Sequence, residues 1–162
     1  MHMRHIRFMF LLALLGAPGA ATAQMLSPDG YGKIGFGDRL DAVERRLGQR
    51  ATPRPHDPAC SIVRFKRYPN VTFMVEQGVV VRADAKTIVR NSAGITARMS
   101  ARDALQRQPA MRAEPHKYDE HGQYLILAQG PDKALVFEAS HGKLQRIRAG
   151  LKPAVDYVEH CS

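Results

Sequence analysis

The sequence predicts an α+β domain in which two tandem repeats each contribute one helix and a three-stranded antiparallel meander. Three observations lead to this fold class. Similar segments recur 62 positions apart, each opens with helix-start signals, and each continues in three strand-like runs separated by turns. Packed together, the repeats would form a two-layer domain of about six strands, with the helices on one face of the sheet.

The first 23 residues have the features of a secretory signal peptide. Arg4 and Arg7 provide a positive start, Phe8 to Ala17 are apolar, and an A-x-A cleavage site ends at Ala23. A run of about ten apolar residues is shorter than the roughly 20 that cross a bilayer. We therefore expect cleavage near Ala23, which would release residues 24–162 as a single periplasmic or secreted domain without a transmembrane segment.

The charge of the chain limits its partners. It has 24 Lys and Arg against 15 Asp and Glu, a formal net charge of +9, which falls to +7 when Arg4 and Arg7 leave with the signal peptide. In a cytosolic protein this charge would suggest nucleic acid. Export removes nucleic acid from the candidates and favours an acidic protein or an anionic envelope component. The alternative is that the charge only keeps a small domain soluble.

The two cysteines of the mature chain predict one disulfide. Cys60 and Cys161 are an even pair in an exported protein. Their bond would tie the C-terminal tail to the middle of the chain. A zinc site that adds His56 and His160 is the alternative, but oxidation would consume both thiols. We expect neither a metal nor a cofactor.

The predicted helices begin at corresponding positions of the two repeats, residues 32–86 and 93–149. Asp38 and Ser100 are the N-cap candidates. Each is followed three residues later by a carboxylate, which is favourable near the positive end of a helix. Stop signals follow after about ten residues, at Gly48 and Pro109.

Each helix precedes three runs with strand composition. Alternation is clearest around Val71 to Glu76 and Val79 to Asp84. The remaining runs are Ser61 to Tyr68, Gln123 to Gln129, Ala134 to Ala139 and Lys143 to Ala149. The connections are too short for helical crossovers, so neighbouring strands should pair antiparallel. Pro153 should stop the last strand.

The repeats resemble two exported families. Gly35-Phe36-Gly37-Asp38 and the helix ending Arg46-Leu47-Gly48 look like the opening of repeats in the beta-lactamase inhibitor protein family, which has two, and in the SmpA/OmlA outer-membrane lipoprotein family, which has one. Tyr118 to Tyr124 look like part of uncharacterised exported proteobacterial domains. The resemblance covers residues 32–149 and implies a sheet face that grips another macromolecule. The chain departs from both families, because one disulfide would span both repeats and no cysteine follows the leader for lipidation.

Basic residues gather on the predicted strands and provide the candidate binding site. Alternation places Arg64 with Lys66, and Arg146 with Arg148, on one face of their strands, and Arg82 corresponds to Arg146 in the other repeat. Arginine suits carboxylate and phosphate groups because its guanidinium binds them with two parallel hydrogen bonds. We interpret these residues as an open basic sheet face that holds an acidic partner. An ordinary solvated face is the alternative.

Other chemistries have weaker support. The glycines at 30, 32, 35 and 37 lack the spacing of a phosphate-binding loop, and no Gly-x-Ser-x-Gly motif is present. Glu76 and Glu138 occupy corresponding strand ends and could pair in a hydrolase of sugar polymers. We favour a non-enzymatic binding protein. The alternatives are an envelope assembly factor held by hydrophobic contacts and, last, this hydrolase.

Overall fold

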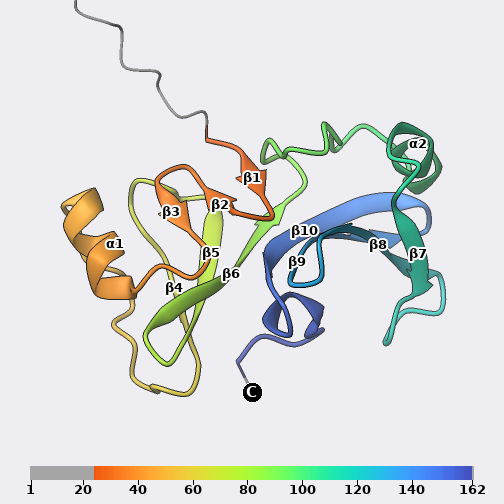
Figure 1. The fold of residues 1–162 in the computed structure, drawn as a ribbon. Coiled ribbons are helices and arrows are strands. Elements are labelled where there is room, and N and C mark those ends of the chain that lie inside the picture. The colour runs from red at the N-terminus through yellow and green to blue at the C-terminus, as the bar shows by residue number, and fades with distance from the viewer. Residues whose placement is uncertain (1–23, 162) are drawn as a thin grey trace, which may run out of the picture.

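The computed structural model describes residues 24–161, so the predicted signal peptide lies outside the described residues. These residues form ten strands, two α-helices and one 3-10 helix (Figure 1). The helices are α1 Leu40–Leu47, α2 Ala101–Arg107 and η1 Ala154–Asp156. The strands are β1 Leu26–Ser27, β2 Gly30–Tyr31, β3 Ile34–Gly35, β4 Ser61–Val63, β5 Val71–Glu76, β6 Val79–Lys86, β7 Arg112–Pro115, β8 Gly122–Gln129, β9 Lys133–Ser140 and β10 Lys143–Leu151.

Seven strands form one antiparallel sheet in the order β4-β5-β6-β10-β9-β8-β7. The pairing of β6 with β10 joins its two halves and sets Lys86 opposite Arg146. The β5–β6 and β9–β10 hairpins both turn through two residues of positive φ, at 77–78 and 141–142. That backbone conformation matches the right-handed twist of paired strands, and glycine is the second residue of both turns. Strands β1, β2 and β3 form a separate small sheet.

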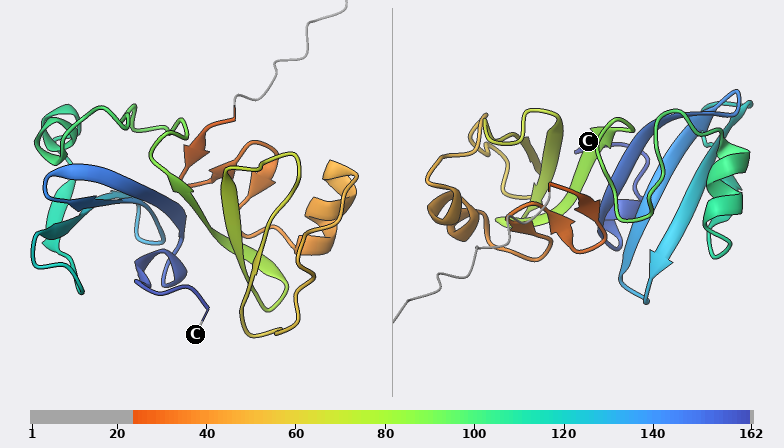
Figure 2. Two further views of the ribbon diagram at one scale, coloured as in Figure 1. Left: turned by 180° about the vertical axis from the view of Figure 1, so that it is seen from behind. Right: turned by 90° about the horizontal axis from the view of Figure 1, so that it is seen from above.

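One face of the large sheet carries the main core. Phe73 and Ala83 from one half and Phe137 and Ile147 from the other are almost completely buried there. The same cluster includes Leu40 and Val43 of α1, Ala101 and Ala104 of α2, and Leu26 and Ile34 of the small sheet. The two helices lie at opposite ends of the molecule, with the small sheet between them (Figure 2).

The opposite face is covered in part by the C-terminal tail, residues 152–161. Ile126, Ala134 and Val136 form a second apolar cluster with Val155 of η1. Because side chains alternate between the faces of a strand, the even-numbered residues of β9, those of β6 from Arg82 on and those of β10 from Arg146 on point to this side. We call it the tail face.

The predicted arrangement of two helix-plus-meander repeats is wrong. The second half has four strands because β7 adds to its edge, and residues 24–35 form a sheet of their own. Strand β7 carries a proline and mostly exposed residues, and strands of two residues have no alternation to detect. The helices have eight and seven residues, and the structure is mainly sheet.

The two helix starts also differ. Ser100 caps α2 as predicted: its hydroxyl accepts from the Asp103 amide at 3.2 Å, and Asp103 accepts from the Ser100 amide at 2.9 Å. Asp38 does not cap α1, which has Arg39 at its N-cap position. Its carboxylate accepts instead from the Gly35 amide and from Arg46, at 3.0 and 2.6 Å.

Candidate functional site

The five basic residues proposed from the sequence divide into two groups. Arg82 and Arg148 are buried, with exposed fractions of 1% and 3%. Arg64, Lys66 and Arg146 are exposed. The face that carries them is therefore only partly open, and what covers Arg82 and Arg148 decides where a partner can bind.

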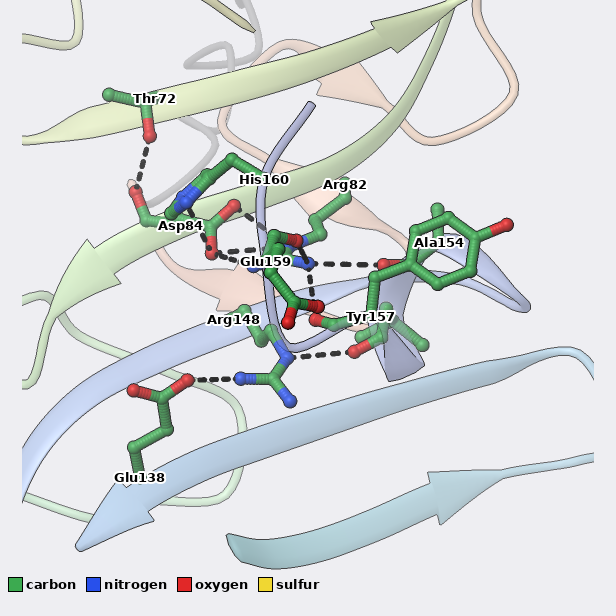
Figure 3. A network of polar contacts seen from close by, with 10 residues as sticks. Thr72, Arg82, Asp84, Glu138, Arg148, Ala154, Tyr157, Glu159 and His160 are labelled. Carbon is green, nitrogen blue, oxygen red and sulfur yellow. Dashed lines mark hydrogen bonds and ion pairs between the residues drawn. The ribbon is translucent and has the colours of Figure 1, made fainter. Parts of the chain in front are cut away.

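Arg82 holds the C-terminal tail on the sheet (Figure 3). Its Nε lies 2.9 Å from Oδ2 of Asp84, and its Nη1 donates to the carbonyls of Ala154, Tyr157 and Glu159 at 3.2, 2.7 and 3.4 Å. A buried cation needs both a counter-ion and hydrogen-bond acceptors. Asp84 is the counter-ion of Arg82, and the carbonyls of the tail are its hydrogen-bond acceptors.

Arg148 is the second tail contact. Its Nη1 is ion-paired with Glu138 (Figure 3). Its Nε donates to the Val155 carbonyl at 2.8 Å, and its guanidinium lies 5.1 Å from the Tyr124 ring centre. Burial, followed by the charge of Arg82, lowers the pKa of the Arg148 guanidinium. The interpretation of Arg82 and Arg148 as partner-binding residues is therefore corrected: they bind the chain's own backbone.

Two further contacts hold the end of the tail. Cys60 and Cys161 form the predicted disulfide, with Cα atoms 5.4 Å apart. From the other side, Tyr118 and Lys117 of the β7–β8 loop bind the Glu159 carboxylate. The Tyr118 hydroxyl, followed by a backbone amide and the Lys117 ammonium, lowers the pKa of Glu159 to about 2. The tail is thus held near η1 by Arg82 and Arg148, and at its C-terminal end by the disulfide and the Glu159 contacts.

An open groove of about 610 Å³ remains beside the tail. We call it the cationic groove. Its exposed cations are Arg64, Lys86 and Arg146, its apolar residues include Ile62, Pro69 and Ile88, and His160 of the tail lines it as well. Asp84 and Glu138 also reach it, but each carboxylate is engaged by a buried arginine. Lys66 lies in the turn after β4 and does not line the groove.

Two of these cations stand directly opposite each other. Lys86 on β6 pairs with Arg146 on β10, and neither forms an ion pair with any residue in the range 24–161. Like charges at opposed positions of an antiparallel pair are destabilising. A β-bulge at Gln145, where the register between β9 and β10 shifts, immediately precedes Arg146. On its other side Arg146 is paired in register with Glu138 of β9, but the Glu138 carboxylate is ion-paired with Arg148. The groove therefore contains an excess of positive charge placed by the backbone.

Sequence reasoning missed Lys86. Arg82, Asp84 and Lys86 alternate onto one face of β6, so this alternation could have identified Lys86 as part of the basic face. The predicted strand stopped at Asp84, two residues too early, and this left Lys86 outside the basic face.

Glu76 and Glu138 do not form a pair. Glu76 ends β5 beside the disulfide, whereas Glu138 lies on β9 and binds Arg148. Three strand spacings separate β5 from β9, which is about 14 Å across the sheet. Glycosidase carboxylates stand about 5–10 Å apart. The two residues thus lack the geometry that the hydrolase alternative requires.

The described residues also bear on metal binding. Cys60 and Cys161 are bonded to each other and are unavailable as thiolates beside His56 and His160. Within residues 24–161, no group of three or more His, Cys, Asp and Glu side chains is placed to hold a metal ion.

Compared with family models, curated proteins and solved structures, the chain matches none of them. The resemblance to the inhibitor and lipoprotein families therefore stays a prediction. Over the described part of the chain, no helix is long and apolar enough to cross a membrane.

Proposed function

We propose that this chain is an exported, non-enzymatic binding protein that holds an acidic group of a macromolecular partner in the cationic groove. The opposed pair Lys86 and Arg146 carries the proposal, because two cations without a counter-ion form a ready site for an anion. Arg64 adds a third cation at the same groove. The disulfide is compatible with export, and the sequence of residues 1–23 supports it.

The lining of the groove changes the set of residues that we expect to contact the partner. Arg82 and Arg148 are buried, and each already binds a carboxylate and the backbone of the tail, so they are not the open cations of the groove. Within residues 24–161, no side-chain hydrogen bond or ion pair engages Arg64, Lys86 or Arg146, so their donors can bind a carboxylate or phosphate of the partner. Each such charge-assisted hydrogen bond is worth about 1.5–3 kcal/mol.

One observation favours the second candidate, an envelope assembly factor held by hydrophobic contacts. Ile88, at the edge of the groove, is 69% exposed. Salt separates the two candidates, because screening weakens exposed charge pairs and leaves apolar contacts in place.

Binding of fluorescent polyglutamate to the full oxidised domain tests the proposal. Reversing the charge of Lys86 and Arg146 to Glu should weaken binding by tenfold or more, since about 1.4 kcal/mol corresponds to tenfold. The matched control is Arg98→Glu/Arg102→Glu, the same double charge reversal at two exposed positions near the start of α2. Equal losses in both variants would mean that only net charge matters, and the groove would be rejected as the site.

A pull-down from envelope extract extends the test to natural partners. A partner held by the groove should be captured by the wild type and by Arg98→Glu/Arg102→Glu, and lost with Lys86→Glu/Arg146→Glu. Capture that persists at high salt and in all three proteins would favour the hydrophobic candidate.

A further inference from the structure

The tail face already binds one stretch of polypeptide. Arg82 and Arg148 together donate to four carbonyls of the tail, those of Ala154, Val155, Tyr157 and Glu159. After η1 the chain becomes extended at Tyr157, with φ −64° and ψ 131°. This face of the sheet is thus built to accept a peptide backbone along its surface.

The cationic groove continues the same face beyond the tail. His160 lines it on the tail side, and Pro69 and Asn70, in the turn before β5, line it on the other side. Its volume of about 610 Å³ falls within the range of about 300–1,000 Å³ found for pockets that enclose compact ligands. A few residues of a peptide fit this space, whereas a flat bilayer surface does not follow its concave shape.

The lining of the groove combines charge with aliphatic surface. Ile88 follows Lys86 by two residues, in the turn after β6, and is the most exposed large hydrophobic side chain among residues 24–161. Ile62 on β4 is half-buried in the same groove. An occupant that covers both features needs an anionic group next to an aliphatic one. The groove is open and half polar, so it offers no closed apolar cavity to an acyl chain.

We propose that the groove takes an acidic–aliphatic segment of another polypeptide. An Asp or Glu carboxylate of the segment would lie between Lys86 and Arg146, and a neighbouring Leu, Ile or Val would cover Ile88. A second aliphatic residue farther along the segment would reach Ile62, which lies level with Arg82 in the sheet. Arg64 would receive a second acidic group. This inference rests on the proposed function, that the groove binds an acidic partner, and adds the chemical class of that partner.

Selection of short random peptides displayed on phage against the immobilised, oxidised full domain tests it. We expect enriched peptides to carry Asp or Glu beside Leu, Ile or Val. Arg146→Glu should weaken their binding by tenfold or more, and Ile88→Ser should weaken it several-fold. Arg98→Glu should leave it unchanged. Polyglutamate, which has no aliphatic group, should bind Ile88→Ser as well as the wild type.

The outcomes separate this inference from the function on which it rests. If acidic peptides bind Ile88→Ser and the wild type equally, the peptide class is overturned and the anion-binding groove stands. If Arg146→Glu changes the binding of neither the peptides nor polyglutamate, both the peptide class and the proposed function of the groove are overturned. Enrichment of peptides without acids, or no enrichment, overturns the inference. Groove-dependent binding to phosphatidylglycerol vesicles in place of peptides would assign the site to lipid headgroups instead.

Discussion

The guanidinium of Arg82 lies 2.7 Å from the carbonyl oxygen of Tyr157, a residue 75 positions later in the chain. This contact fixes the tail over a strand that would otherwise present its charge to solvent. It also divides the basic residues of the tail face into those that stabilise the fold and those that remain free at the groove.

Replacing Arg82 with Met should destabilise the domain by about 3–5 kcal/mol, since removing one partner of a buried ion pair leaves the other uncompensated. Asp84 would lose its counter-ion, and three tail carbonyls would lose a donor. Urea unfolding of the oxidised protein measures the loss. Arg64→Met is the control, because Arg64 is exposed and its removal should change the free energy of unfolding by about 0.5 kcal/mol or less. Similar losses in both variants would contradict the assigned role of Arg82.

Replacing both Cys60 and Cys161 with Ser should destabilise the domain, because the bond closes a loop across 101 positions. The chain-entropy model gives an upper value of about 4–5 kcal/mol for a loop of this length. Amide hydrogen exchange should show faster exchange at residues 157–161, with β10 still protected, because β10 is paired with β6 on one side and β9 on the other. Unchanged exchange in the tail would show that the disulfide does not hold it.

Arg146→Gln should stabilise the domain while weakening ligand binding. Removing one of two opposed cations relieves a repulsion of about 0.2–1 kcal/mol, and little attraction to the cross-strand neighbour Glu138 is lost, because Arg148 already engages that carboxylate. The same substitution at Arg148 should destabilise, because that side chain is buried and ion-paired with Glu138. Thermal unfolding at low salt compares the two variants. High salt should reduce the gain of Arg146→Gln, since it screens the same repulsion in the wild type. Destabilisation by Arg146→Gln would place that side chain among the structural contacts.

The contact between Glu159 and Tyr118 should make stability depend on pH in acid. The pKa of Glu159 is lowered from its ordinary 4.5 to about 2, so the folded state favours the ionised form. Its contribution is present in full above pH 4.5 and is lost as the pH falls toward 2. The free energy of unfolding should therefore decline less steeply for Glu159→Gln than for the wild type across this interval. Parallel curves would mean that the tail contact does not persist in solution.

Local patterns predicted several elements correctly. The bounds of β5 are those expected from the alternation of Val71 to Glu76, because one face of that strand is buried. Ser100 caps α2, since its partner Asp103 is three residues away in the chain. The Cys60–Cys161 bond followed from an even cysteine count. Each of these features depends on neighbours in sequence or on composition.

Features that depend on which of several possible contacts forms, near or far along the chain, were not predicted. Asp38 and Ser100 look alike as helix starts, but Arg46 and the Gly35 amide take up the Asp38 carboxylate. Strand β7 forms because β8 offers an edge, despite the proline in its sequence. Residues 24–35 form their small sheet in contact with the main core, where Leu26 and Ile34 become buried.

The sequence by itself determined the approximate places of six strands, β4 to β6 and β8 to β10, the disulfide pairing and the alternation of basic residues along those strands. Only the tertiary structure decided which of those charges are free. Arg82 and Arg146 have the same side chain and similar strand contexts, so alternation cannot distinguish them. The tail covers the first and leaves the second beside Lys86, since burial depends on which distant segment packs over a residue.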